Sequence, residues 1–365
     1  MSPRVVASTT LSPTMSDSTF PVMREALQQA LHLRFAQALN IVTHLETSAL
    51  APLAAPLTRG IIAYFQTHWQ TPQHPPAHHI GHQAFAMVLK EGHGRLKQVP
   101  HDPGINLLLG LAAVFDTLLQ QQHGAWPDFQ SLTQGRAWLQ QALMAQETMG
   151  DAHLGLGMLY FAGVNLPPLL QYFMGDRSEL SLAETIDHLH RAAEAGTFSQ
   201  DIARTFLLQL YVMDKRYDDA RALGHALQQV YPENGYYAFL IGRSQCTQGH
   251  YTACATTLGA LATALAETPS CLANSDHRFD LYYTWGQALH KTENYTLAFE
   301  AFRQAINHDP KAHKDESLWA KYYLAMLYER RGATKTAQQI YRTLLRGRNA
   351  DTLHRQVEHR LDLLR

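Results

Sequence analysis

Hydrophobic residues recur every three or four positions along most of the chain, as they do on one face of an amphipathic helix. The first such stretch runs from Val22 to Leu45, and further stretches cover residues 54–69, 78–98, 104–122, 130–148 and 151–162. Dipeptides that commonly end helices separate several of them, such as Thr71-Pro72 and Asp102-Pro103. No run of alternating β-branched residues bounded by hairpin turns interrupts this pattern. The sequence therefore predicts an all-α protein.

Small and aromatic residues recur in the second half at the spacing of a two-helix hairpin. In the clearest unit, Gly286 and Ala298 stand where the two helices cross, Trp285 and Phe302 fill the remaining space, and Pro310 ends the second helix. Similar residues mark three more units, at Leu207–Pro232, Ile241–Leu258 and Leu324–Leu344. The tyrosines at 217 and 251 are 34 residues apart, whereas 251 and 295 are 44 apart, so about ten residues are inserted near 269–276.

These four units, over residues 199–349, resemble tetratricopeptide repeats, and the polar segment 350–365 fits a closing helix. Before them, residues 151–198 resemble a degenerate repeat whose second helix, Leu182–Gly196, follows an insertion. A divergent helical region, 20–150, precedes it. This order is similar to a family of bacterial tetratricopeptide-repeat proteins over about residues 22–345. The resemblance implies an α-solenoid of helical hairpins in a right-handed superhelix, and a non-catalytic interaction scaffold.

The N-terminal residues and the cysteines bear on the compartment. Residues 1–19 are rich in Ser and Thr and are expected to be disordered, with no apolar run as long as the core of a secretory signal. Cys246, Cys254 and Cys271 show no C-x-x-C spacing, which argues against a disulfide scaffold or a cysteine zinc site and suits a reducing compartment. We expect a cytoplasmic protein, although many members of the resembled family look exported.

Composition narrows the classes of partner. Of 365 residues, 46% are hydrophobic, enough for a sizeable core, and the net charge of −1 excludes a globally basic nucleic-acid binder. No uninterrupted apolar stretch approaches the roughly 18 residues of a membrane span. The charge is uneven: between Lys311 and Arg365 there are 12 basic and 6 acidic residues. We interpret this excess as a solvated face, with a site for an acidic partner as the alternative.

Stacked hairpins present a concave surface, lined by the first helix of each unit, where an extended peptide or a partner helix can bind. The residues that face away from the packing positions are Tyr236, Phe239, Arg243, Tyr283, Gln287, His290, Lys291, Trp319, Tyr322, Met326 and Arg330. Aromatic residues and arginine are enriched at binding hot spots. We expect Tyr283 and Tyr322 to lie side by side in one groove; the alternative is that each packs against the next helix. Chaperone-binding repeat domains resemble each other in a clamp of basic and asparagine side chains that holds a C-terminal carboxylate. The corresponding positions of this sequence do not carry that clamp.

The sequence lacks the motifs that would indicate a catalytic site. Gly155-x-Gly157 lacks a third glycine and a preceding strand, so it indicates helix packing rather than a dinucleotide loop. The phosphate-binding loop, the H-E-x-x-H motif and the G-x-S-x-G motif do not occur. Because no nucleophile and base can be paired, we predict a protein that is not an enzyme and needs no cofactor. Its partner is then a protein or peptide, with a second copy of this chain as a further candidate.

The 21 histidines are the one unusual feature of the composition. His74, His78 and His82 recur every four residues, and His78 and His82 would share a helix face on which imidazoles could bind a metal. However, Pro75-Pro76 breaks the helix, and no carboxylate lies nearby. A catalytic zinc normally needs three protein ligands. A metal- or ligand-responsive sensor that uses residues 68–82 is therefore the alternative to the scaffold.

Overall fold

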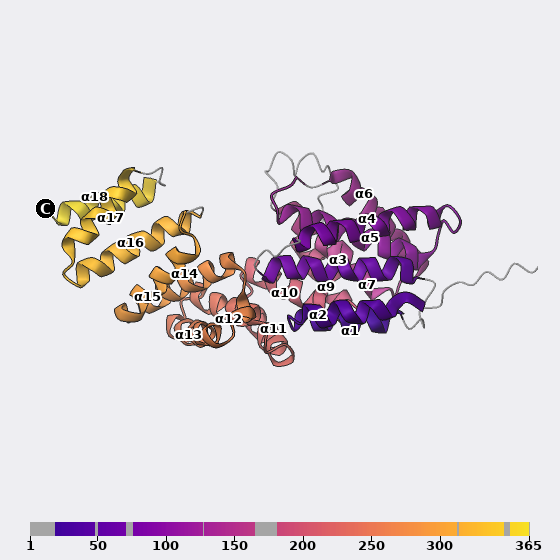
Figure 1. Cartoon of the computed structure of the whole chain (residues 1–365), viewed down its shortest axis with the longest axis horizontal. Helices are drawn as coiled ribbons and strands as arrows, with labels where there is room; N and C mark the ends of the chain where they lie inside the picture. The colour runs from indigo at the N-terminus through magenta and orange to yellow at the C-terminus, as the bar shows by residue number, and fades with distance from the viewer. Residues whose placement is uncertain are drawn as a thin grey trace, which may run out of the picture. The chain divides into compact units, whose positions relative to one another are not determined.

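The computed structural model describes residues 19–47, 50–70, 76–126, 128–164, 181–311, 314–346 and 351–364, and every regular element in these ranges is helical. The chain divides into two compact units (Figure 1): unit 1 comprises Met1–His68 and Pro72–Leu207, and unit 2 comprises Trp69–Thr71 and Leu208–Arg365. The division falls inside a helix of the first predicted repeat. The predicted all-α fold, a solenoid of helical hairpins, is confirmed. The tail predicted at 1–19 lies outside the described residues, except for Thr19, which begins the first helix.

After the first predicted helix, unit 1 contains the helices that the hydrophobic pattern predicts, with ends that differ by only a few residues. They are α1 (Thr19–Leu31), α2 (Phe35–Val42), the short 3-10 helix η1 (Thr43–Thr47), α3 (Ala51–Trp69), α4 (Ala77–Leu96), α5 (Pro103–Gln121), α6 (Phe129–Ala145), α7 (Gly150–Val164) and α9 (Leu182–Ala195). The next helix, α10 (Gln200–Met213), begins in unit 1 and ends in unit 2.

The one long helix predicted from Val22 to Leu45 is wrong, because the chain breaks between α1 and α2. Leu33 has a φ of 62°, a left-handed conformation that no helix can continue through. The backbone N–H of Arg34 then bonds back to the carbonyl of Gln29, which closes α1. Hydrophobic spacing stays in phase across the break, which is why the periodicity alone did not show it.

Helix α5 is the centre of unit 1, packed against α4, α6 and α7. All its residues from Gly104 to Leu119 are buried. Among the described helices it alone is long and apolar enough to cross a membrane, with a mean hydropathy of 1.3, but 89% of that window is buried inside the protein, as in a core helix. The helix was predicted from the sequence, but not as a candidate membrane span, because Asn106 and Asp116 interrupt its apolar run.

Helices α7 and α9 form the degenerate hairpin predicted around residues 151–196, and its insertion lies outside the described residues. A Cβ on Gly155 would lie 2.6 Å from Leu139 Cδ1, and one on Gly157 would lie 2.7 Å from Leu189 Cδ2. These glycines therefore serve helix packing, as predicted. Asp151, in the same motif, is fully buried and accepts hydrogen bonds from the backbone N–H groups of residues 197, 198 and 199 at 2.9–3.1 Å.

In unit 2 each helix from α11 onward packs against the next one along the chain. The helices are α11 (Tyr217–Val230), α12 (Gly235–Thr247), α13 (Tyr251–Glu267), α14 (Ser275–Lys291), α15 (Tyr295–His308), α16 (Asp315–Arg330), α17 (Thr334–Arg346) and α18 (Asp351–Leu363), with the 3-10 helix η3 (Pro269–Leu272) before α14. Each hairpin turn places one residue in the left-handed region: Lys215, Gly249, Glu293 and Gly332 have φ values of 60°, 82°, 62° and 77°. The same turn thus recurs in every hairpin.

The α14–α15 hairpin shows the packing that its sequence predicts. A Cβ on Gly286 would lie 2.8 Å from Phe302 Cε1, and Ala298 has no exposed surface. Trp285 reaches back to the preceding hairpin, where its indole N–H donates to the carbonyl of Ala255 at 3.0 Å. Small residues at the crossing therefore let the two helices of this hairpin pack closely.

Candidate binding surface of unit 2

Two cavities lie next to each other in unit 2, and His290, near the end of α14, lines both. The first, which we call the Arg243–Lys291 cavity, has a volume of about 250 Å³ and lies among α12, α13, α14 and α16. The second, the Arg330–Arg360 cavity, has a volume of about 460 Å³ and lies among α14, α15, α16, α17 and α18. Together they line a path from α12 to the closing helix.

The Arg243–Lys291 cavity brings together four of the predicted surface residues: Arg243, Gln287, His290 and Lys291. Arg243 and Lys291 are exposed. The amide of Gln287 donates a hydrogen bond to the hydroxyl of Tyr283 at 3.0 Å. Tyr323, from the next hairpin, completes the wall and stacks on Phe302 with ring centroids 5.0 Å apart. The cavity therefore combines two exposed cations with a fixed aromatic wall.

A disulfide joins Cys246, in the wall of this cavity, to Cys254 on α13, with Cα atoms 5.2 Å apart. It links the two helices of one hairpin across the turn at Gly249. This bridge was not predicted from the sequence, where the lack of C-x-x-C spacing argued against a disulfide scaffold. Positions eight apart meet here because the chain reverses between them. The bridge does not fit the expected reducing compartment, since disulfides are rare in cytosolic proteins.

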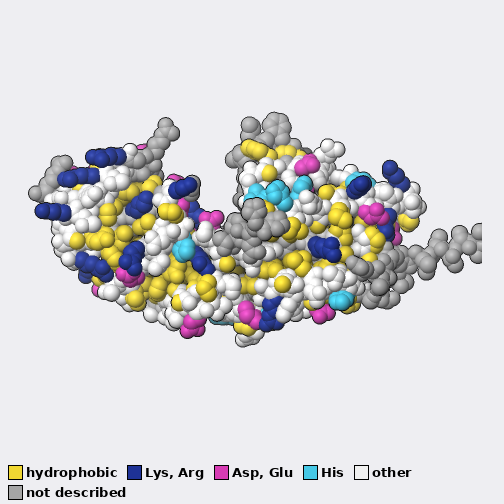
Figure 2. Space-filling model, in the orientation of Figure 1, with side chains coloured by type: hydrophobic (Ala, Val, Ile, Leu, Met, Phe, Trp, Pro, Cys, Tyr) yellow, Lys and Arg dark blue, Asp and Glu magenta, His cyan; other side chains and the backbone are white. Residues whose placement is uncertain are grey.

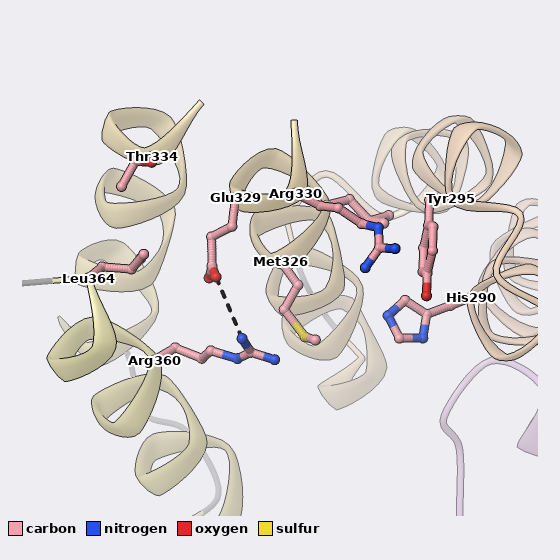
Figure 3. Close-up of a pocket in the computed structure, with 9 residues that line it drawn as sticks. His290, Tyr295, Met326, Glu329, Arg330, Thr334, Arg360 and Leu364 are labelled. Atoms are coloured by element: carbon pink, nitrogen blue, oxygen red, sulfur yellow. Dashed lines mark ion pairs between the residues drawn. The ribbon is translucent and has the colours of Figure 1, made fainter. Parts of the chain in front are cut away.

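In the Arg330–Arg360 cavity, the two arginines come from different helices: Arg360 extends toward Met326, and Arg330 extends toward Tyr295 (Figure 3). The guanidinium carbon of Arg330 lies 3.7 Å from the centroid of the Tyr295 ring, a cation–π contact. Arg360, on α18, lies 3.6 Å from the carboxylate of Glu329. Burial lowers the pKa of His290, and the positive charges of Lys291, Arg330 and Arg360 lower it further. His290 therefore lies close to three cationic side chains.

Tyr283 is half-buried rather than open to a partner. Its ring stacks on Phe279 at 5.8 Å and meets the edge of Phe302 at 6.2 Å. Burial raises the pKa of the Tyr283 hydroxyl, and the neighbouring Tyr323 adds to the shift. Its hydroxyl accepts a hydrogen bond from Gln287, which lines the Arg243–Lys291 cavity.

Three predicted surface aromatics are buried, and the prediction that they line an open groove is wrong. Tyr236 is 6% exposed, between Trp69 and His277; Phe239 is 2% exposed. Tyr322 is 6% exposed beneath Trp319 and Tyr341. Each was assigned from its helix face alone, but the next hairpin, or η3 and α18, covers that face. This matches the alternative of packing against a neighbouring helix.

The remaining predicted residues reach the surface. Trp319 is half-buried and meets Tyr322 edge to face at 5.7 Å. Met326 lies half-buried in the wall of the Arg330–Arg360 cavity. Figure 2 shows hydrophobic side chains over α14–α18 with Lys and Arg side chains around them. The accessible surface of these hairpins is therefore apolar in its centre and cationic at its edge.

Tyr295, Tyr323 and Arg360 were not among the predicted site residues; Tyr295 was identified only as a repeat position. Tyr323 directly follows a predicted residue, and it lines the Arg243–Lys291 cavity whereas Tyr322 is buried. Arg360 was hidden because residues 350–365 were read only as a closing helix. An arginine on a helix that stacks where the next repeat would begin is the signal that could have revealed it.

The histidine-rich segment of unit 1 does not assemble its predicted ligands. His74 lies outside the described residues. His82 Nδ1 lies 2.8 Å from a carboxylate oxygen of Asp116, whereas His78 packs against His79 and His123 with ring centroids 4.2 and 3.8 Å away. Across the described parts of the chain, no three His, Cys, Asp or Glu side chains could hold a metal ion. The sensor stays a prediction, which a thermal shift scan with divalent metals tests.

No protein-family model and no curated protein matches this sequence. Among solved structures, yeast Tom70 aligns with a TM-score of 0.43 and 10% sequence identity, covering 95% of this chain and 82% of that one. The human IFIT1 dimer with m7Gppp-AAAA aligns with a TM-score of 0.41 and 13% identity, covering 92% and 74%. The human IFIT1 dimer with PPP-AAAA aligns with a TM-score of 0.36 and 14% identity, covering 92% of this chain and 73% of that one. Likeness at this level says nothing about what this chain binds.

Proposed function

We propose that the protein is a non-catalytic scaffold that holds an extended segment of a partner protein along the two adjoining cavities of unit 2. The observation that carries this proposal is the shared residue His290: one path runs past both cavities, from Arg243 to Arg360. An extended chain suits such a path because its alternate side chains can enter successive pockets. Half-buried aromatics and exposed arginines supply the residue types that dominate binding energy.

The buried aromatics change which residues should be mutated. Replacing Tyr322 would remove core packing, so a loss of binding could not be separated from a loss of folding. Arg243 and Lys291 are exposed and line the first cavity, and they can be replaced without opening the core. With a partner in hand, Arg243→Ala with Lys291→Ala should weaken binding by about 2 kcal/mol, mainly through faster dissociation.

The experiment is site-specific photo-cross-linking in cells, with a benzophenone amino acid in place of Lys291 or, as the matched control, Arg303. Arg303 is an exposed residue on α15 that is paired with Glu300 and lies outside both cavities. We expect a protein adduct from position 291 and none from 303. An adduct of twice the chain's mass identifies a second copy as the partner. Equal adducts from both positions, or none from 291, would remove the binding site from this face.

The compartment is part of the proposal. The sequence favours the cytoplasm, but a stable bridge between Cys246 and Cys254 requires an oxidising compartment or an oxidised state of the protein. Fractionation of the source cells with thiols trapped at lysis tests both.

A further inference from the structure

The Arg330–Arg360 cavity has an unusual distribution of charge. Two guanidinium groups reach it from different helices, Arg330 from α16 and Arg360 from α18 (Figure 3). Between them lie apolar atoms of Met326, and Leu364 forms part of the far wall. A volume of about 460 Å³ is enough to hold neighbouring side chains of a bound peptide segment.

Arg330 is held in place but still has hydrogen-bond donors to offer. Its guanidinium lies over the ring of Tyr295 at 3.7 Å, which restrains its position. Within the described parts of the chain, no carboxylate forms an ion pair with it. A guanidinium that stacks through its face keeps its N–H groups, which lie in its plane, free to bind an oxyanion with two parallel hydrogen bonds.

Arg360 is already partly neutralised. Glu329 lies 3.6 Å from its guanidinium and also accepts a hydrogen bond from the Tyr341 hydroxyl. Burial opposes the charge on Arg360, but a hydrogen bond to Tyr322 and the charge of Glu329 outweigh it, so the pKa of Arg360 is raised. Glu329 is thus committed to α17 and α18 and leaves Arg330 without a counter-charge.

The net charge of the side chains that line the cavity determines which anionic group fits it. Two arginines and one glutamate leave a single positive charge, because His290, with its lowered pKa, is neutral at pH 7. One positive charge matches a carboxylate. A phosphate group, with a charge of about −1.5 to −2 at pH 7, would bring surplus negative charge next to Glu329.

We infer that the Arg330–Arg360 cavity binds the carboxylate of an acidic residue in an extended peptide, whose neighbouring apolar side chain packs on Met326 and Leu364. This inference rests on the proposed function, since it specifies which segment of a partner the path selects. Arg330 supplies the two hydrogen bonds, and Arg360 supplies the longer-range attraction.

A bound carboxylate would also favour protonation of His290, because it adds a negative charge beside an imidazole that is surrounded by cations. Affinity for an acidic peptide should therefore rise as the pH falls from about 7.5 to 5.5, where side-chain carboxylates stay ionised. His290→Gln should abolish this rise.

The test uses an array of random-sequence 12-residue peptides, probed with the fluorescently labelled full chain. We expect bound peptides to be enriched in Asp or Glu next to an apolar residue. In solution, replacing that Glu by Gln should weaken binding about tenfold, the usual worth of a hydrogen bond to a charged group. In Arg330→Gln the same peptide change should have a much smaller effect, because only the longer-range attraction of Arg360 remains. Arg303→Gln, on the outer face of α15, is the matched control.

A second variant shifts binding in the opposite direction. Glu329→Gln keeps an acceptor for Tyr341 but removes the negative charge, so acidic peptides should bind about threefold or more tightly and phosphoserine peptides should become acceptable. Because this variant predicts a gain, it cannot be mistaken for misfolding.

Failures can be told apart. If no peptide on the array binds, both the proposed function and this inference fall. If peptides bind without a preference for acidic residues, or if Arg330→Gln keeps the preference, the inference falls and the scaffold stands. A preference of the unaltered protein for phosphoserine, or displacement of the peptide by a short RNA oligonucleotide, would also overturn it.

Discussion

Unit 1 and unit 2 are both built of paired helices, but they satisfy buried polar groups over very different distances along the chain. In unit 1 the carboxylate of Asp151 holds backbone N–H groups 46 to 48 residues away. In unit 2 the buried carboxylate of Asp309 bonds the backbone N–H of Lys314 and the hydroxyl of Ser317, five and eight residues away. Repeat hairpins thus satisfy their buried polar groups with hydrogen-bond partners that are close in sequence. Unit 1 depends on contacts between distant segments, so a single defect should spread further there.

The largest effect is expected from Asp151→Ala. It leaves three backbone N–H groups at the start of α10 buried without an acceptor, and each unsatisfied donor is costly. We expect a loss of about 3 kcal/mol in the free energy of unfolding, measured by urea denaturation followed by circular dichroism.

Glu91→Ala is the control, because Glu91 is an exposed residue of unit 1 whose one partner is Arg95. Its free energy of unfolding should change by less than about 0.5 kcal/mol. Equal effects of the two substitutions would mean that the long-range carboxylate does not hold unit 1 together.

In unit 2 the corresponding defect is steric. Ala298→Trp places a large ring at a position with no exposed surface, between the helices of the α14–α15 hairpin, and should cost about 2–3 kcal/mol. Leu297→Trp, one residue earlier and 44% exposed, is the matched control. Thermal melting distinguishes them. A parent-like melting temperature for the Ala298 variant would show that the repeat register is misplaced.

Acid should weaken unit 1 through a buried histidine pair. His153 on α7 and His188 on α9 have Nδ1 atoms 2.7 Å apart, and Arg136, Glu184, Asp187 and Arg191 surround them. Burial, together with the smaller effects of the charges on His188 and Arg191, lowers the pKa of His153 to about 4, although Asp187 partly offsets them. Burial likewise lowers the pKa of His188.

A histidine with a depressed pKa takes up its proton in the unfolded chain before it does so in the folded one. The stability that the neutral pair contributes is therefore complete above pH 6.5 and is lost as the pH falls toward about 4. We expect a loss of about 2 kcal/mol over this window in urea titrations. His153→Gln should flatten the curve, whereas the exposed His190→Gln should not. A parent-like slope in the first variant contradicts this assignment.

The smallest effect should be a gain. Neither polar atom of the Asn106 side chain, buried in the middle of unit 1 on α5, has a hydrogen-bond partner among the described residues. Asn106→Leu removes two unsatisfied groups while keeping the same number and branching of side-chain heavy atoms, and should stabilise by about 1 kcal/mol. Thr117→Val is the control, because the Thr117 hydroxyl donates to the carbonyl of Ala113 at 3.0 Å. A loss of stability in Asn106→Leu would indicate a partner for the amide.

The sequence predicts the fold of both units well, because helix periodicity survives whatever the helices pack against. It predicts the packing of unit 2 in more detail, since Gly286, Ala298 and Phe302 depend only on neighbours within one hairpin. Asp151 could not be understood in this way. Its partners lie beyond the 165–180 insertion, and nothing in the local pattern points to residues 197–199.

The candidate site was predicted only in part, for the same reason. Arg243, Lys291 and Arg330 lie at exposed helix ends, where the helix face alone determines accessibility. Tyr236 is the second residue of α12 and Tyr322 lies in the middle of α16, and in both places a neighbouring element covers the ring. Whether an aromatic at such a position is buried depends on the distance and stagger between hairpins, which a periodicity does not contain.

The bridge between Cys246 and Cys254 has a practical consequence: whether it is oxidised or reduced in a molecule reports the redox conditions that the molecule has met. While the bridge is intact, Cys271 is the one free thiol, and it is only 8% exposed. An alkylating reagent added to the folded, oxidised protein should therefore leave its mass nearly unchanged, whereas reduced molecules gain mass at Cys246, which faces the cavity. A single intact-mass spectrum, taken after trapping at lysis, would count the two populations in any culture.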